Sequence, residues 1–86
     1  MIVGAFRPQA IHDPDADAIY VHLSEGEAAR SKALDDLRII DYSRDGGVIG
    51  VEFISVSGGI DLSDLPHHDK VEKLIGELNL GIKIFA

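Results

Sequence analysis

The amino-acid sequence predicts an α+β fold, a small antiparallel β-meander of four to five strands with one C-terminal helix packed on a sheet face. Three observations support this prediction. Short stretches of alternating apolar and polar residues are separated by turn-forming residues, an Asp-Gly dipeptide lies between two β-branched runs, and apolar residues near the end recur at helical spacing. At this length the chain forms a single domain over residues 1–86.

The clearest element is a hairpin over residues 37–55, with Asp45-Gly46 as its turn. A two-residue type I′ turn needs positive φ at both central positions, which Asp-Gly accommodates. One side of this hairpin is then almost entirely apolar. The predicted register pairs Tyr42 with Ile49, Ile40 with Val51 and Arg38 with Phe53, and it places Ile39, Asp41, Gly50 and Glu52 on the other side.

Three more strands are predicted before this hairpin. Residues 9–12 follow Pro8, which suits the start of a strand because it needs no ladder N–H. Residues 28–34 form a weaker strand, with Arg30 and Lys32 exposed. Between them, residues 18–23 alternate, with Ile19, Val21 and Leu23 on one face and Tyr20 and His22 on the other.

The C-terminal part changes character after the hairpin. Residues 64–79 carry one apolar stripe at helical spacing, and the helix is expected to begin at a Ser63 or Asp64 cap with Pro66 in its first turn. Residues 82–85 alternate like a strand. Whether this strand pairs within its own subunit or with a partner stays open at this point.

Composition limits the classes of function. A net charge of −7 opposes direct binding to a phosphate backbone, so no nucleic-acid partner is expected. The absence of cysteine excludes disulfides, thiolate zinc sites and cysteine nucleophiles. No apolar run approaches bilayer length, and the opening eight residues lack a signal-peptide pattern, so a soluble, cytoplasmic protein without membrane contact is predicted.

Charge and size also suggest partners. A small domain whose single helix covers one sheet face needs a second cover, and a homo-oligomer, a dimer or higher, would provide it. The acidity favours a basic protein as a further partner, because complementary charge speeds encounter.

Part of the chain is similar to a known family. Residues 12–23 read HDPDADAIYVHL, residues 39–42 read IIDY before Asp45-Gly46, and residues 48–54 read VIGVEFI. In these motifs, over about residues 9–56, the chain resembles the bacterial family called domain of unknown function 2283. The resemblance implies no established activity. Some small members are encoded beside toxin-like proteins, which implies an antitoxin-like role for those members.

Several polar residues are candidates for a functional site. Asp13, Asp15 and Asp17 alternate as at the start of an EF-hand loop, but Ala18 and Ser24 stand where that loop needs Gly and Glu. We therefore interpret this stretch as a turn capped by its own side chains and expect no bound cofactor. The predicted candidate face comprises Asp13, Asp17, Tyr20, His22, Asp41 and Glu52.

Two functional hypotheses follow. The first is a non-catalytic protein-interaction module, an antitoxin-like partner of a small basic protein. The alternative is a small metal-dependent or acid/base enzyme, or a ligand-binding protein, that uses His12, His22, Asp41 and Glu52. If residues 9–12 and 18–23 form a hairpin, the His12 and His22 rings could approach each other and Asp13.

Overall fold

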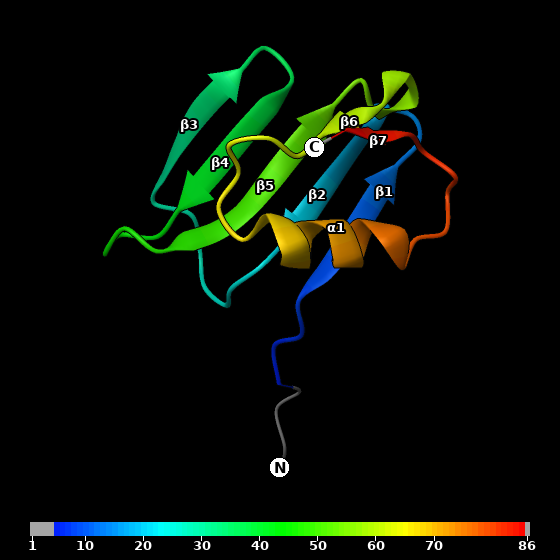
Figure 1. Cartoon of the computed structure of the whole chain (residues 1–86). Coiled ribbons are helices and arrows are strands. Elements are labelled where there is room, and N and C mark those ends of the chain that lie inside the picture. Colours follow the sequence, from blue (N-terminus) through cyan, green and yellow to red (C-terminus); the bar gives the residue numbers. More distant parts are fainter. Residues whose placement is uncertain (1–4, 86) are drawn as a thin grey trace.

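A computed structural model of the chain describes residues 5–85 (Figure 1). Five strands form one antiparallel sheet in the order β1-β2-β5-β4-β3, which confirms the predicted α+β class with a helix near the C-terminus. A separate pair, β6 and β7, is parallel. The elements are β1 (Gln9–Asp13), β2 (Ala18–His22), β3 (Arg30–Asp35), β4 (Arg38–Tyr42), β5 (Val48–Ile54), a 3-10 turn (Val56–Gly58), β6 (Ile60–Asp61), α1 (His68–Gly76) and β7 (Ile84–Phe85).

The order of the strands differs from that of a simple meander, because β2 pairs with β5 and not with β3. The residues of β3 and β5 explain why β2 pairs with β5. All residues of β5 are buried or half-buried, on both faces of the strand, so β5 suits the centre of the sheet. The first four residues of β3 are exposed and include Arg30 and Lys32. Charged, exposed residues are typical of an edge strand, where they oppose pairing with other chains.

The hairpin of β4 and β5 keeps most of its predicted register, since Ile40 faces Val51 and Arg38 faces Phe53. The predicted partner of Tyr42 is wrong: Tyr42 pairs with Val48, and the register shifts by one residue before the Asp41–Gly50 pair. Ile49 is therefore the extra residue of a β-bulge. Its carbonyl accepts hydrogen bonds from Leu23 N and Ser24 N, at 2.8 and 3.1 Å.

The turn of this hairpin also differs from the predicted type I′ form. Gly46 N donates to Ser43 O at 3.0 Å, and Ser43 N donates to Gly47 O at 2.8 Å. Gly46 has φ of 94°, while Asp45 does not adopt a positive φ. The loop thus has three residues, a tight turn followed by a glycine in the left-handed region. Ser43 Oγ and Asp45 Oδ1 both accept from Gly47 N, which favours the longer loop.

One face of the sheet carries the core, and the chain after β5 covers it (Figure 1). α1 packs against β1 and β2, while β6 and β7 lie across the far end of the strands. The core has contributions from both layers. Its buried residues are Ile19, Val21, Leu23, Ile40, Val51, Phe53, Val56, Ile60, Leu62, Leu65, Val71, Leu74 and Ile75.

The helix is shorter than the predicted 64–79, because α1 begins at His68 and ends at Gly76. Asp64 and His67 have φ of 61° and 55°, so the chain leaves helical geometry twice before α1 begins. The N-cap position is His67, without a side-chain cap hydrogen bond, and the predicted cap by Ser63 or Asp64 is wrong. Pro66 lies in the preceding turn, not within the helix.

In this structure the last strand pairs within its own chain. β7 is limited to Ile84–Phe85. Ile60 N of β6 donates to the carbonyl of Lys83, just before β7, and Leu62 N, just after β6, donates to the carbonyl of Phe85 in β7, both at 2.8 Å. Within residues 5–85, no helix is both long enough and apolar enough to cross a membrane.

Candidate functional site

The sheet face opposite α1, here called the uncovered face, holds most of the predicted candidate residues. Strand alternation and register place thirteen strand positions on it. These positions supply three carboxylates and no lysine or arginine. They are Gln9, Ile11, Asp13, Ala18, Tyr20, His22, Ser31, Ala33, Ile39, Asp41, Gly50, Glu52 and Ile54.

Three strands contribute to a hydrogen-bonded cluster at the centre of this face. Tyr20 Oη on β2 donates to Asp41 Oδ2 on β4 at 3.0 Å, and Ser31 Oγ on β3 donates to Asp41 Oδ1 at 2.6 Å. Asp41 therefore accepts from both sides, and each of its oxygens has a donor. We call Tyr20, Ser31 and Asp41 the tyrosine cluster.

Gly50 allows the tyrosine cluster to form. It lies on β5, between β2 and β4, and pairs with both His22 and Asp41. A Cβ atom at this position would lie only 2.6 Å from Tyr20 Cζ and 2.6 Å from the Val21 carbonyl oxygen. The tyrosine ring can cross β5 because the glycine has no side chain. A glycine within a strand often marks such a close approach.

The environment of Tyr20 keeps its hydroxyl protonated. Burial raises the pKa of Tyr20 to about 12, with further contributions from its hydrogen bond to Asp41 and from the charges of Asp41 and Glu52. At neutral pH the hydroxyl is therefore a hydrogen-bond donor and not a base.

Aromatic rings extend the uncovered face away from the cluster. The His22 ring lies edge-on to Tyr20, with ring centroids 5.8 Å apart, and edge-on to Phe6, with centroids 4.9 Å apart. Glu52 lies directly opposite both Tyr20 and Ile39, on its two neighbouring strands. The structure thus brings together four of the predicted residues, Tyr20, His22, Asp41 and Glu52.

The other two predicted residues have structural contacts at one end of the sheet. Asp13 Oδ1 accepts from Asp15 N at 3.1 Å and from Ala16 N at 3.2 Å, as expected for a capped turn. Asp17, with φ of 53°, accepts from Ser57 N at 3.0 Å and from Ser57 Oγ at 2.7 Å. Asp17 thereby joins the β1–β2 turn to the start of the C-terminal segment.

The two histidines that the sequence suggested as weak metal ligands lie on opposite faces. His12 pairs with Ile19 on the covered face, whereas His22 pairs with Gln9 on the uncovered face. The register therefore separates their rings. Among the described residues, no group of three or more His, Cys, Asp or Glu side chains is placed to hold a metal ion.

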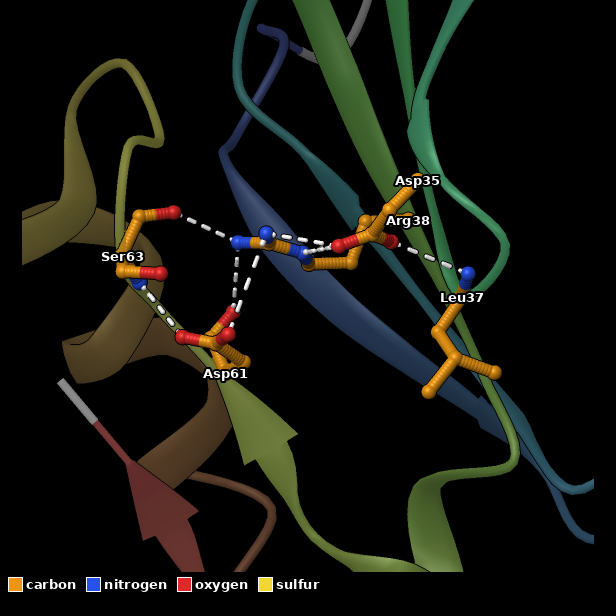
Figure 2. Close-up of polar contacts among 5 residues, drawn as sticks. All are labelled: Asp35, Leu37, Arg38, Asp61 and Ser63. Atoms are coloured by element: carbon orange, nitrogen blue, oxygen red, sulfur yellow. Dashed lines mark hydrogen bonds and ion pairs between the residues drawn. The ribbon is translucent and has the colours of Figure 1, made fainter.

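Sequence reasoning missed a second polar cluster, centred on Arg38 (Figure 2). Arg38 is a buried charged residue at the covered face, 6% exposed. Its Nε and Nη2 donate to Asp35 Oδ2 at 3.0 and 2.8 Å, and its Nη1 donates to the carbonyl oxygens of Asp61 and Ser63. Figure 2 shows the guanidinium between β4 and the segment that follows β6.

Charge and hydrogen bonding around Arg38 stabilise the ionised carboxylates. The Arg38 hydrogen bond lowers the pKa of Asp35, and the Leu37 N–H adds to this effect. The backbone and side chain of Ser63, with a smaller contribution from Arg38, lower the pKa of Asp61. A signal was present in the sequence, because an arginine at an inward position of a hairpin requires a buried partner.

These features define a small α+β protein whose five-stranded sheet has one face covered by the C-terminal segment and one face that carries a tyrosine–carboxylate cluster. The chain belongs to the DUF2283 family of proteins of unknown function, whose family model matches residues 11–57. The match includes the whole tyrosine cluster, Gly50 and Glu52, and it ends before β6. Searches of curated proteins and of solved structures found no match.

Proposed function

We propose that this protein is a non-catalytic interaction module that binds a basic protein through its uncovered face. One observation carries the proposal: strand positions on this face supply Asp13, Asp41 and Glu52 but no lysine or arginine. A surface of one sign attracts a partner of the opposite sign and speeds its docking. The net charge of −7 adds to the attraction at long range.

Apolar groups on the same face support binding. Ile11 is 51% exposed, and Ile39 and Ile54 are half-buried beside the carboxylates. Interfaces combine apolar contact with a polar rim, and this face offers both. An antitoxin-like role beside a small basic protein, as the family resemblance implies, is one form of this function.

Charge also bears on the predicted homo-oligomer. Two copies that met through the uncovered face would bring Asp41 and Glu52 of each copy together, and like charges at an interface are unfavourable. We therefore assign this face to a different protein, and self-association would use another surface. The metal branch of the alternative hypothesis relied on His12 near His22, but His12 lies on the opposite sheet face. Its acid/base branch relied on Asp41 and Glu52, which both lie on the uncovered face.

Capture from the native host tests the proposal. The tagged full chain, the Glu52→Lys variant and the Glu72→Lys variant would serve as baits, because Glu72 is exposed on α1 and gives the same change of charge elsewhere. We expect one basic protein to bind the wild type and Glu72→Lys but not Glu52→Lys, with binding that weakens as salt rises.

Two outcomes of the capture experiment would contradict the proposal. Recovery of the bait alone would refute the proposal, and so would equal capture by both lysine variants. Circular dichroism of each bait would establish that a lost interaction does not reflect a lost fold.

A further inference from the structure

We propose that a pocket at the end of the sheet receives one apolar side chain from the basic protein, next to a lysine or arginine of that protein. This inference rests on the proposed function and names an anchoring site for it. The pocket has a volume of about 170 Å³ and lies between the β3–β4 turn, the end of β5 and the β6–β7 pair. Figure 1 shows these segments together at the end of the sheet away from α1.

The pocket borders the uncovered face at one edge. Leu37 and Ile54 form one wall, and they alternate with the covered-face residues Arg38 and Phe53. Ile54 N donates to Leu37 O at 2.8 Å, which fixes these two positions side by side. Ile54 is the outward residue that follows Glu52 on β5, so a partner that lies over Ile39 and Glu52 would extend past Ile54 and around the end of the sheet to enter the pocket.

Most of the lining residues are apolar, and two of the apolar side chains are partly open to solvent. Leu37 is 48% exposed and Phe85 is 45% exposed, so this single pocket contains two of the four large apolar side chains that are exposed within residues 5–85. The Phe85 ring rests on Gly59, where a Cβ would lie 3.3 Å from Phe85 Cζ. The volume is comparable to the roughly 150 Å³ that holds one benzene ring in an apolar cavity.

Charge at the pocket favours a cation beside the apolar group. The side chains of Asp35 and Asp61 are 45% and 51% exposed, whereas Arg38 is 7% exposed. The carboxylates therefore face solvent while the guanidinium faces inward. An anion would have to displace the internal partners of Arg38. Two cations are also present: Arg38 lines the pocket, and Lys83 Nζ lies 5.3 Å from the centroid of the Phe85 ring.

A small probe tests the pocket separately from the protein partner. The probe is 2-phenylethylammonium, which carries one apolar ring and one cation, and 3-phenylpropionate is the matched anion. Titration of the full ¹⁵N-labelled chain would be followed by amide NMR. We expect the cation to shift the amides of Leu37 and Gly59, and the anion to bind more weakly. Absence of these shifts, or tighter binding of the anion, would overturn the proposal.

Two substitutions locate the site. Gly58 lines the pocket and a Cβ there meets no atom within 4 Å, so Gly58→Leu should obstruct the pocket without a clash. Gly76→Leu is the control, because Gly76 also has open space but does not line this pocket. We expect Gly58→Leu to weaken binding of the probe about tenfold, as expected when an anchoring contact is lost, and Gly76→Leu to leave it unchanged.

If Gly58→Leu does not fold, Leu37→Ser removes an exposed wall of the pocket and should weaken the same binding. Equal binding of the probe by wild type, Gly58→Leu and Leu37→Ser would refute the pocket.

The pocket proposal and the proposed function can also fail separately. A basic protein that is captured equally by wild type and Gly58→Leu supports the uncovered face but refutes the anchor. Binding of the probe without any captured protein supports the pocket as a ligand site and refutes the interaction module.

Discussion

At the scale of single residues, Gly50 and Tyr20 depend on each other. The tyrosine crosses β5 only because position 50 has no side chain, and the Val21 carbonyl oxygen limits the same space from the backbone. We expect Gly50→Ala to destabilise the fold by about 1–3 kcal/mol, since an added methyl group in a filled space forces the backbone to move. Urea unfolding measures this change.

Gly76→Ala is the control for Gly50→Ala, and its effect should have the opposite sign. Gly76 belongs to α1, and a Cβ there meets no neighbour within 4 Å. Alanine in a helix is favoured over glycine by about 0.5–1 kcal/mol, so a small stabilisation is expected. Equal changes in the free energy of unfolding of both variants would show that the close approach of Tyr20 to Gly50 does not contribute to stability.

The Tyr20 hydroxyl gives a second prediction at this scale. Tyr20→Phe removes the donor to Asp41 Oδ2 and leaves only Ser31 as a side-chain donor to that carboxylate. A loss of about 1.5–3 kcal/mol is expected, because hydrogen bonds to charged groups contribute this much. Tyr42→Phe is the control, since the Tyr42 hydroxyl makes no hydrogen bond within the described residues. Comparable losses in both variants would contradict the assigned role of the bond.

The sequence predicted that Tyr20, His22, Asp41 and Glu52 belong to outward positions, because alternation within a strand is a local property. It did not predict the Tyr20–Asp41 hydrogen bond. That contact depends on the pairing of β2 with β5, two strands far apart in the sequence, and on the space above Gly50. Likewise, only the register of the β1–β2 hairpin separates His12 from His22.

At the scale of elements, Arg38 holds the C-terminal segment to the sheet. Arg38→Met would keep most of the apolar stem but remove the donors to Asp35 and to the carbonyl oxygens of Asp61 and Ser63. We expect this variant to lower stability at neutral pH and to raise amide exchange in β6 more than in β2. Uniform loss of protection in both strands would indicate that Arg38 does not fasten one segment in particular.

The same cluster predicts the response to acid. Asp35, Asp45 and Asp61 have pKa values below the usual range, Asp35 chiefly through Arg38 and Asp45 chiefly through the Ser43 hydroxyl. A carboxyl group with a lowered folded-state pKa stabilises the protein above its unfolded pKa, about 4, and loses this contribution as pH falls through the folded pKa.

Wild-type stability should therefore fall between about pH 5 and pH 3, within the range over which carboxylates take up protons. In Arg38→Met the fall should be smaller but not absent, because the shift of Asp45 does not involve Arg38. Urea midpoints at several pH values provide the measurement. A pH profile identical to that of the wild type would contradict the coupling between Arg38 and Asp35.

Elements with local signals were predictable and elements with competing signals were not. Alternation identified β2, the Asp-Gly dipeptide between β-branched runs identified the β4–β5 hairpin, and β1 and β3 were predicted from weaker local signals. Its turn was mispredicted because Ser43 and Gly47 extend the loop beyond Asp45-Gly46. The start of α1 was mispredicted because two residues of positive φ, Asp64 and His67, have no reliable signature in side-chain type.

At the scale of the whole molecule, the chain has two parts: the sheet, which the family model matches, and the C-terminal segment, which follows that match. Local residue patterns correctly predicted an antiparallel sheet of up to five strands with one helix packed on it. The sequence did not indicate that β6 and β7 would pair with each other, since parallel pairing of two-residue strands has no sequence signature. It did predict that the helix covers only one sheet face, and the structure places β6 and β7 on that same side.

The division between these parts leads to a last prediction, concerning a fragment that ends at residue 57. Such a fragment keeps the five strands but loses Ile60, Leu62, Val71 and Ile75, which bury one face of the sheet. An apolar face of that size is unstable in water, because burial is the main favourable contribution to folding. We expect the fragment to be unfolded or self-associated, as measured by size-exclusion chromatography and by binding of a hydrophobic dye.

The full chain with Val71→Asp is the companion to the fragment. This substitution places an unpaired charge at a fully buried position of α1. It should weaken the packing of α1 on the sheet while the C-terminal segment remains present. Glu72→Lys, one residue away on the exposed side, should remain folded. A folded, monomeric fragment would show that the sheet is self-sufficient. In that case the C-terminal segment would be an attachment to a complete domain, and its contact with Arg38 would be dispensable for folding.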